Sequence, residues 1–284
     1  MSRMALRASP QPPTMIVGKS MVGETPPLGL GEPFRLGGGD RLTPAGIPHA
    51  IIHDHQPALR EAVAAACQAC IENERGWFRT SLVLVGKDTG RRHAARFLAQ
   101  VARVPHVRLD NDQLARCAAA GEISPRSDAQ WVSPVATAMA AARCANPIVS
   151  VPEADALSPE SLAALKLMAG PSAGQVWPEL RLRTFVDLSE VSWVLQVSDP
   201  SKLPPELLGG AYVVEMDDLW HAGDTLRTSV TLEVLHDLDR KPEPAHLTGH
   251  RTSRGVPSPA QLYQDIRSAL KDDTPLLGPS SAQQ

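Results

Sequence analysis

The sequence predicts an α/β fold, in which a five-stranded parallel sheet carries helices on both faces. Between about residues 47 and 218, short apolar runs alternate with segments of helical periodicity. Strands that are buried on both faces of a parallel sheet have this near-continuous apolar character. One of the runs also leads through a glycine towards a helix, which is the layout of many phosphate-binding sites.

The five strands are expected in TSLVLVG, VPHVRLD, NPIVSV (146–151), EVSWVLQV (190–197) and AYVVEM (211–216). PHAIIHD is a further short apolar run ahead of them. Helices are expected at 57–74, at 92–103 and over PVATAMAAARC. Another should begin at Pro159, after Ser158 as its N-cap, and end at Gly170.

Three regions follow from this pattern. Residues 1–45 are rich in Pro and Gly and lack periodicity, which predicts a flexible N-terminal arm or a strap laid over the domain. Residues 46–218 form the α/β domain. Residues 219–284 contain two helical patterns, in DTLRTSVTLEVLHDLDR and SPAQLYQDIRSALKDD, around a Pro-containing linker, and end in a tail that we expect to be disordered.

Composition narrows the classes of partner. The chain of 284 residues has a formal net charge of −3 and no basic stripe, so nothing favours nucleic-acid binding. No apolar run approaches the ~18–20 residues of a membrane span. Three prolines follow the first two arginines where a signal peptide would need apolar residues. We therefore expect a cytoplasmic protein.

Two groups of potential metal ligands are present. Cys67 and Cys70 form a CxxC pair, but they share one apolar helix face and no second pair stands at ligand spacing, so core packing is favoured over zinc or redox chemistry. His53 and His55 form an HxH without a third ligand at suitable spacing. No metal site is predicted.

The strand–glycine–helix segment reads G-K-D-T-G-R-R-H from Gly86. A working P-loop reads G-x-x-x-x-G-K-[ST], because its glycines admit the phosphates, its lysine neutralises their charge and its hydroxyl holds Mg²⁺. Here the second glycine is Arg91, the lysine is Arg92 and the hydroxyl is His93. Lys87, Arg91 and Arg92 still place positive charge near a helix N-terminus, which attracts anions.

Three further segments follow in order: CANPIVSVPEADAL, FVDLSEVSWVLQVSD and LPPELLGGAYVVEM. With the glycine segment, they make residues 50 to 218 resemble the ATPase core of the AAA+ superfamily, in particular its Lon-like branch. The resemblance implies a P-loop NTPase-like sheet and a reduced helical C-terminal lid over 219–284. Lon-type proteolysis would need a separate Ser–Lys domain, which we do not expect in this chain.

The resemblance also assigns roles to positions. The Walker B aspartate falls on Pro152, whereas the neighbouring glutamate, Glu153, and a later acid, Asp155, are retained. The sensor 1 asparagine falls on Ser198 and the arginine finger on Gly210. Glu153 is the candidate catalytic residue. The vestigial nucleotide site implied by the resemblance comprises Gly86, Lys87, Asp88, Thr89, Gly90, Arg91, Arg92, His93, Asp155 and Ser198.

The functional expectation is a degenerate AAA+ domain that acts as a pseudo-ATPase, without hydrolysis, in protein interaction or regulation. The alternative is an ATP-binding AAA+ ATPase with weak or partner-dependent hydrolysis. A decaying duplicate without a role is a third reading. The cofactor is accordingly either none, or ATP or ADP with Mg²⁺ bound weakly. The expected partner is a protein or an AAA+ relative, in an oligomer, with neither nucleic acid nor membrane.

Overall fold

The fold is described from a computed structural model of the chain. It describes residues 12–43, 46–48, 57–86, 88–121, 131–170, 176–216, 231, 234 and 264–268. Lys87, the run PHAIIHD from its second residue and both histidines of the HxH lie outside these residues. Among the described residues, no helix is long and apolar enough to cross a membrane.

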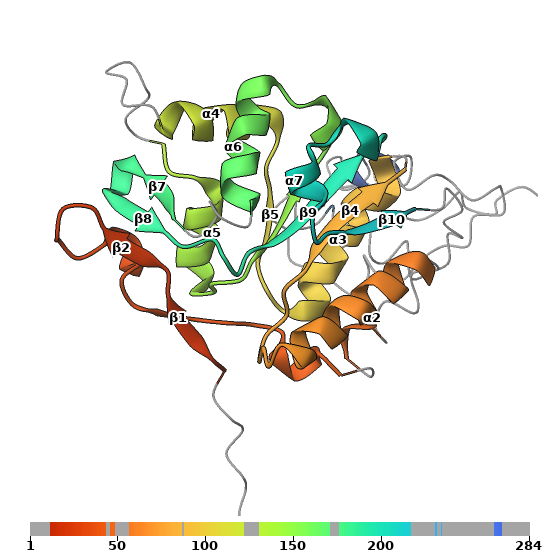
Figure 1. Cartoon of the computed structure of the whole chain (residues 1–284), viewed down its shortest axis with the longest axis horizontal. Coiled ribbons are helices and arrows are strands. Elements are labelled where there is room, and N and C mark those ends of the chain that lie inside the picture. The colour runs from red at the N-terminus through yellow and green to blue at the C-terminus, as the bar shows by residue number, and fades with distance from the viewer. Residues whose placement is uncertain are drawn as a thin grey trace, which may run out of the picture.

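The main sheet has five strands, all parallel to their neighbours (Figure 1). Their order in the sheet is β10-β4-β9-β6-β5, so the first of them along the chain lies inside the sheet. This confirms the predicted P-loop NTPase-like α/β sheet. The strands are β4 (Ser81–Val85), β5 (His106–Arg108), β6 (Ile148–Val151), β9 (Ser192–Val197) and β10 (Tyr212–Glu215).

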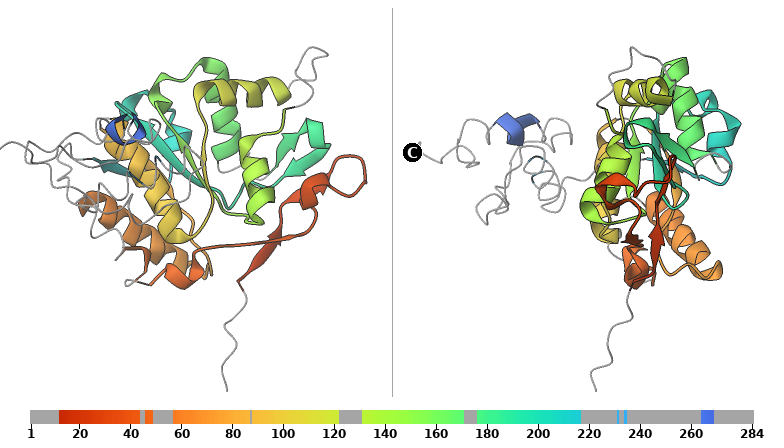
Figure 2. Two further views of the ribbon diagram at one scale, coloured as in Figure 1. Left: turned by 180° about the vertical axis from the view of Figure 1, so that it is seen from behind. Right: turned by 90° about the vertical axis from the view of Figure 1, so that its left-hand side faces the viewer.

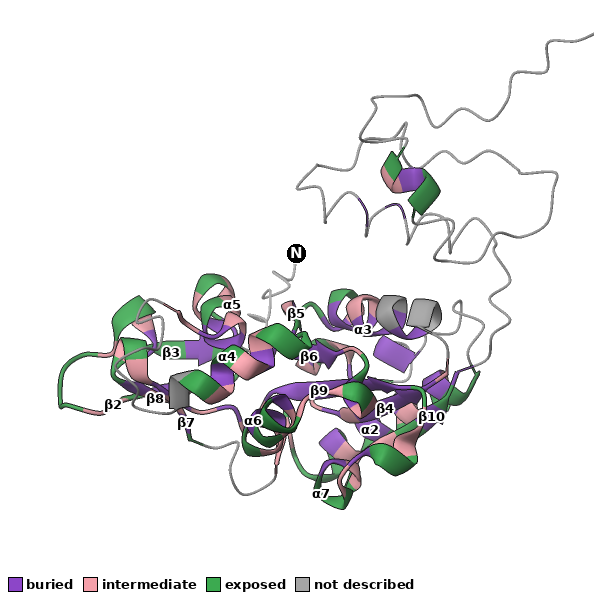
Figure 3. Cartoon of the chain, turned by 90° about the horizontal axis from the view of Figure 1, so that it is seen from above, coloured by how far each residue is buried: buried purple, intermediate pink, exposed green. Residues whose placement is uncertain are grey.

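Strand β4 shows why these sequences form a doubly covered sheet. Successive side chains of a strand point to opposite faces. Leu82 and Leu84 enter one apolar cluster, whereas Val83 and Val85 enter another. All four are buried, and Figure 3 shows the buried strands between the outer helices.

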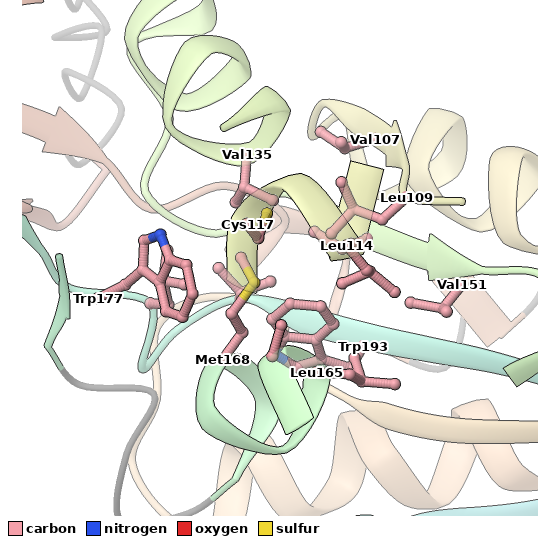
Figure 4. Packing of buried hydrophobic residues seen from close by; sticks show 14 of the residues in the cluster. Val107, Leu109, Leu114, Cys117, Val135, Val151, Leu165, Met168, Trp177 and Trp193 are labelled. Atoms are coloured by element: carbon pink, nitrogen blue, oxygen red, sulfur yellow. The ribbon is translucent and has the colours of Figure 1, made fainter. Parts of the chain in front are cut away.

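The helices divide between these two clusters. Helices α2 (Pro57–Glu72) and α3 (Asp88–Ala102), orange and yellow in Figure 2, contribute to the cluster around Leu82 and Leu84. Helices α4 (Asn111–Gly121), α5 (Pro134–Ala142), α6 (Pro159–Ala169) and α7 (Pro205–Leu208) contribute to the other. Figure 4 shows part of this second cluster, with Cys117, Met168 and Trp177 lying close together.

Two helix starts illustrate how sequence encodes these boundaries. Ser158 caps α6 by accepting a hydrogen bond from the N–H of Ser161, as predicted. Helix α4 has no counterpart among the predicted helices, although Asp110 and Gln113 form a reciprocal pair of hydrogen bonds at its start, at 2.9 and 3.0 Å. This capping box fixes the entry to α4.

The N-terminal segment forms small antiparallel sheets. Strand β1 (Thr14–Ile16) pairs with β3 (Pro33–Arg35). Strand β2 (Gly18–Ser20) pairs with β8 (Thr184–Val186), which pairs with β7 (Trp177–Glu179). Residues 12–43 are called the N-terminal strap below. Five apolar side chains of this strap are buried; they are Val17, Leu30, Phe34, Leu36 and Leu42.

Short 3-10 turns complete the described elements. They are η1 (Pro27–Gly29), η2 (Gly39–Arg41), η4 (Ala154–Ala156), η5 (Leu180–Leu182) and η6 (Pro200–Lys202). Of the predicted reduced lid, the structure describes Thr231, Val234 and the residues 264–268, all in helical conformation. The rest of that prediction lies outside the described residues.

Candidate functional site

The candidate site lies at the carboxyl edge of the main sheet, where β4, β9 and β6 end side by side. Val85 pairs with Val197, and Val151 pairs with Leu195. Because parallel strands end at the same edge, the turns that follow these three strands meet there. The structure thus brings Gly86, Ser198 and the turn 152–155 to one edge of the sheet.

Gly86 is fixed by packing against the neighbouring strand. Its φ of +140° is one that other residues rarely adopt. A Cβ at this position would lie 3.0 Å from the carbonyl oxygen of Met216, at the end of β10. Its N–H donates to the carbonyl oxygen of Val197 at 3.2 Å. A close backbone approach therefore accounts for this glycine without any bound phosphate.

Helix α3 begins at Asp88, whereas the sequence predicted its start at about Arg92. Only Gly86 and Lys87 separate strand β4 from the helix. A P-loop cradles phosphate with successive backbone N–H groups of an open loop. From the second turn of α3 onwards, the backbone N–H groups form hydrogen bonds within the helix. Arg91, which stands where a P-loop has its second glycine, lies within this helix.

Arg91 lies inside the protein. Its side chain is 3% exposed. Its carbonyl oxygen accepts a hydrogen bond of 3.0 Å from Nε2 of Gln196, a buried residue of β9. The sequence predicted Arg91 as one of several basic groups that attract an anion, whereas the structure buries this residue. The side chains of the other residues predicted there lie outside the described part of the structure; they are Lys87, Asp88, Thr89, Gly90, Arg92 and His93.

The turn after β6 holds the two retained acids in different environments. Glu153 is exposed and has a left-handed backbone, with φ +48° and ψ +42°. Asp155 points back to the turn after β9, where its Oδ2 accepts hydrogen bonds from the N–H groups of Ser198 at 3.0 Å and Asp199 at 2.9 Å. Asp155 therefore joins two neighbouring strand ends. Ser198 contributes its backbone to this contact, and its side chain is exposed.

Two described positions at this edge bear on the predicted binding of a nucleotide with Mg²⁺. The position that should supply a metal-supporting carboxylate is Pro152, which follows β6 directly. One carboxylate oxygen of Asp155 already accepts hydrogen bonds from two backbone N–H groups. Within the described residues, no group of three or more His, Cys, Asp or Glu side chains is placed to hold a metal ion.

The residue that the sequence resemblance aligns with the arginine finger, Gly210, lies at the opposite, amino edge of the sheet. Gly210 stands between α7 and β10 and has a φ of +79°. A Cβ there would meet nothing within 4 Å. The segment that should present a basic side chain to another molecule thus presents a turn. Leu208, two residues before Gly210, is partly buried and packs against the core.

The cysteines belong to the core, as the helix pattern predicted for Cys67 and Cys70. All four are buried and unbridged. Burial raises the pKa of Cys67 to about 12 and that of Cys117 to about 12. The thiol of Cys70 donates to the carbonyl oxygen of Arg79 at 3.2 Å. Thiols with such a high pKa are poor nucleophiles, so this is a packing role.

Sequence reasoning missed three buried polar residues: Asn146, Glu179 and Gln196. Each lies in or beside an apolar run of the sequence. Such a run predicts that its residues are buried, but it does not predict the hydrogen bonds that a buried polar side chain needs. Glu179, in β7, accepts a hydrogen bond of 3.3 Å from the N–H of Ser133, which caps α5. Burial raises the pKa of Glu179 above its ordinary value.

The solved structures compared with this chain share a low level of similarity with it. No protein-family profile and no curated protein matches the sequence. A RuvB mutant from Thermotoga maritima, in which glycine replaces proline, is 11% identical with a TM-score of 0.39; the match covers 79% of this chain and 67% of that one. A second RuvB mutant, with arginine in place of lysine, is 14% identical with a TM-score of 0.41, over 81% and 66%. The chain spans about two thirds of each structure's length. Similarity at this level does not indicate a function for this chain.

Proposed function

We propose that the chain is a degenerate AAA+ domain of the Lon-like type, a pseudo-ATPase that acts through protein interaction or regulation. The observation that carries this proposal is the start of α3 at Asp88, directly behind Gly86 and Lys87. A strand that passes almost at once into a helix leaves little open loop to surround a triphosphate. The proposal keeps the cytoplasmic location that the sequence predicts.

Several groups that an ATPase of this kind needs are replaced, at this edge of the sheet and at the opposite one. Arg91 is buried, and Pro152 stands where the metal-supporting aspartate would be. Gly210 replaces the finger, whose loss alone costs about 10³–10⁵ in rate, or roughly 4–7 kcal/mol of transition-state stabilisation. A partner could supply one missing group. It could not also rebuild the strand–helix junction.

The retained Glu153 does not by itself restore hydrolysis. A general base must lie within hydrogen-bond reach of an oriented water molecule. Glu153 is exposed on a left-handed turn, and the neighbouring Asp155 is engaged with the backbone after β9. We therefore assign Asp155 a structural role at this edge.

The alternative is an ATP-binding AAA+ protein with weak or partner-dependent hydrolysis. One observation favours it: the N-terminus of α3 lies at the same sheet edge as Glu153. The first N–H groups of a helix lack partners within the helix and attract anions. A phosphate could bind there, with Arg92 in place of the lysine.

The deciding experiment is calorimetry of the full-length protein with ATP and with ADP, each with and without Mg²⁺. The pseudo-ATPase predicts no heat of binding up to millimolar nucleotide. Micromolar binding that strengthens with Mg²⁺ would instead support the alternative. Inorganic phosphate as a further ligand would separate a simple anion site from nucleotide recognition.

Hydrolysis is tested with Glu153→Gln and with Glu160→Gln as a matched exposed control on α6. We expect no Mg²⁺-dependent turnover in the wild type or either variant. Turnover that Glu153→Gln abolishes and Glu160→Gln preserves would overturn the proposal. An interaction role further predicts that association with an intact AAA+ relative, measured by light scattering, survives Arg92→Ala.

A further inference from the structure

A pocket of about 360 Å³ opens at the amino edge of the main sheet, away from the candidate nucleotide site. It lies where β4, β9 and β10 begin, and it is bounded by α2, α7 and the end of α6. Its volume lies in the range of small-molecule binding sites. One side is polar and cationic, and the other is apolar.

The polar side carries an excess of positive charge. Arg75 Nη1 lies 3.4 Å and Arg79 Nε lies 4.0 Å from the same carboxylate oxygen of Glu190. The indole N–H of Trp77 donates to that oxygen at 2.7 Å. Two guanidinium groups thus share one carboxylate oxygen that is already hydrogen-bonded. Glu190 lies behind these arginines and does not line the pocket, whereas the acid that does line it, Glu206, is paired at 3.1 Å with a lysine of α6.

Hydrogen-bonding capacity at this end remains unused. Thr80 is 6% exposed, and its Oγ1 is buried without a hydrogen-bond partner among the described residues. The buried Nε of Arg79 likewise makes no hydrogen bond to them, although Glu190 lies 4.0 Å away. Burial lowers the pKa of the Arg79 guanidinium from its ordinary value. An anion at this end would meet incompletely used donors.

The other side of the pocket is lined by Trp193, Leu195 and Leu207. These side chains belong to β9 and α7 and are buried in the core. They offer an aromatic ring and two branched side chains, so water in this part of the pocket has few hydrogen-bond partners. An apolar group would displace that water favourably.

We propose that this pocket binds a small organic acid. Its carboxylate would lie against Arg79, Arg75 and Thr80, and its apolar or aromatic body against Trp193 and Leu195. Arginine forms paired hydrogen bonds with a carboxylate and is the side chain best suited to this geometry. The site is independent of the proposed pseudo-ATPase role, because it uses none of the residues at the carboxyl edge.

The test uses the full-length protein and 3-phenylpropionate as the probe, with binding measured by calorimetry. We expect a Kd of about 0.1–1 mM for a carboxylate in such a site. The neutral 3-phenylpropionamide has the same body without the charge, and it should bind at least about tenfold more weakly. Equal binding of acid and amide, or no binding of the acid at about 10 mM, would overturn the proposal.

Variants locate the binding. Arg79→Gln should weaken binding of the acid about tenfold and leave the amide unchanged, whereas Arg181→Gln, which removes an exposed arginine elsewhere, should change neither. Because Arg79→Gln disturbs Glu190, Thr80→Val serves as a second variant of nearly equal shape, with an expected loss of about three- to tenfold for the acid. Full affinity for the acid in a folded Thr80→Val or Arg79→Gln protein would contradict the assignment.

Discussion

Asn146 holds Gly37 by two hydrogen bonds across 109 residues of chain. The N–H of Gly37 donates to Asn146 Oδ1 at 2.7 Å, and Asn146 Nδ2 donates to the carbonyl oxygens of Gly37 at 3.0 Å and Phe78 at 2.8 Å. One buried amide thus joins the N-terminal strap to the segments that lead into β4 and β6. A Cβ on Gly37 would lie 2.7 Å from Val104 Cγ1, so the strap can approach this closely only with glycine.

The substitution Asn146→Ala should destabilise the protein by about 2–4 kcal/mol, because it leaves buried backbone groups of Gly37 and Phe78 without partners. Urea unfolding followed by circular dichroism measures this difference. The control is Gln68→Ala, which removes an exposed amide on α2 and should change stability by less than about 0.5 kcal/mol. An equally small effect of Asn146→Ala would show that the strap is held by other contacts.

Gly86→Ala tests whether this glycine is kept for packing. Its φ of +140° and the 3.0 Å approach of an added Cβ to the carbonyl oxygen of Met216 both oppose a side chain. We expect a loss of about 2–4 kcal/mol in the free energy of unfolding, measured by thermal and urea denaturation.

Gly210→Ala is the matched control. Gly210 has a positive φ of +79°, but an added Cβ meets nothing within 4 Å. Its substitution should cost only the backbone strain, about 1–2 kcal/mol. A loss for Gly86→Ala no greater than that for Gly210→Ala would mean that the contact with Met216 relaxes freely.

The sequence predicted β4, β6 and β9 because these strands are buried on both faces, which produces uninterrupted apolar runs. The edge strands β5 and β10 are partly exposed, and their shorter apolar runs were still sufficient to predict them. It predicted α6 because Ser158 and Pro159 make an unambiguous start. It did not predict α4, whose capping box of Asp110 and Gln113 was present but precedes a short apolar stripe. Local pattern therefore decided most of the fold.

The candidate site was less accessible to sequence reasoning. The bond from Ser198 to Asp155 depends on β6 and β9 being neighbours, and strand order is not encoded in any local pattern. The sequence did not predict that α3 begins at Asp88, because the segment from Gly86 resembles an open phosphate-binding loop. The polar role of Asn146 depends on backbone groups more than 60 residues away in sequence.

Asp155 and Glu153 should respond oppositely to substitution, although both were predicted as site residues. Asp155→Ala removes the acceptor of two backbone N–H groups and should destabilise the protein by about 1–3 kcal/mol. Glu153→Gly relieves a left-handed backbone at φ +48° and should stabilise it by about 0.5–1 kcal/mol.

Glu153→Ala separates the backbone from the side chain in this comparison. Alanine keeps the strain at φ +48° and removes only an exposed carboxylate, so stability should change by less than about 0.5 kcal/mol. Urea unfolding of the three variants provides the measurement. A large loss of stability for Glu153→Ala would show that the side chain of Glu153 makes a stabilising contact, contrary to this prediction.

The pH dependence of stability should carry the signature of Glu179. This carboxyl is 3% exposed; its Oε2 accepts a hydrogen bond from the N–H of Ser133, and its Oε1 has no hydrogen-bond partner among the described residues. Burial is the largest cause that raises its pKa above 4.5, the ordinary value, and the bond from Ser133 opposes the shift. The folded state therefore binds the proton more tightly than the unfolded state.

Stability from this group is fully present below the unfolded pKa of 4.5 and is lost as pH rises through the folded pKa. Glu179→Gln resembles the protonated carboxyl and cannot ionise. It should match the wild type near pH 4 and exceed its stability by roughly 1–3 kcal/mol at about pH 8, as measured by urea unfolding across that range. The control Glu160→Gln, on the exposed side of α6, should stay within about 0.5 kcal/mol of the wild type throughout. If the advantage of Glu179→Gln were the same at both ends of the range, the carboxylate would be stabilised in the fold by a partner, and its burial would not govern its titration.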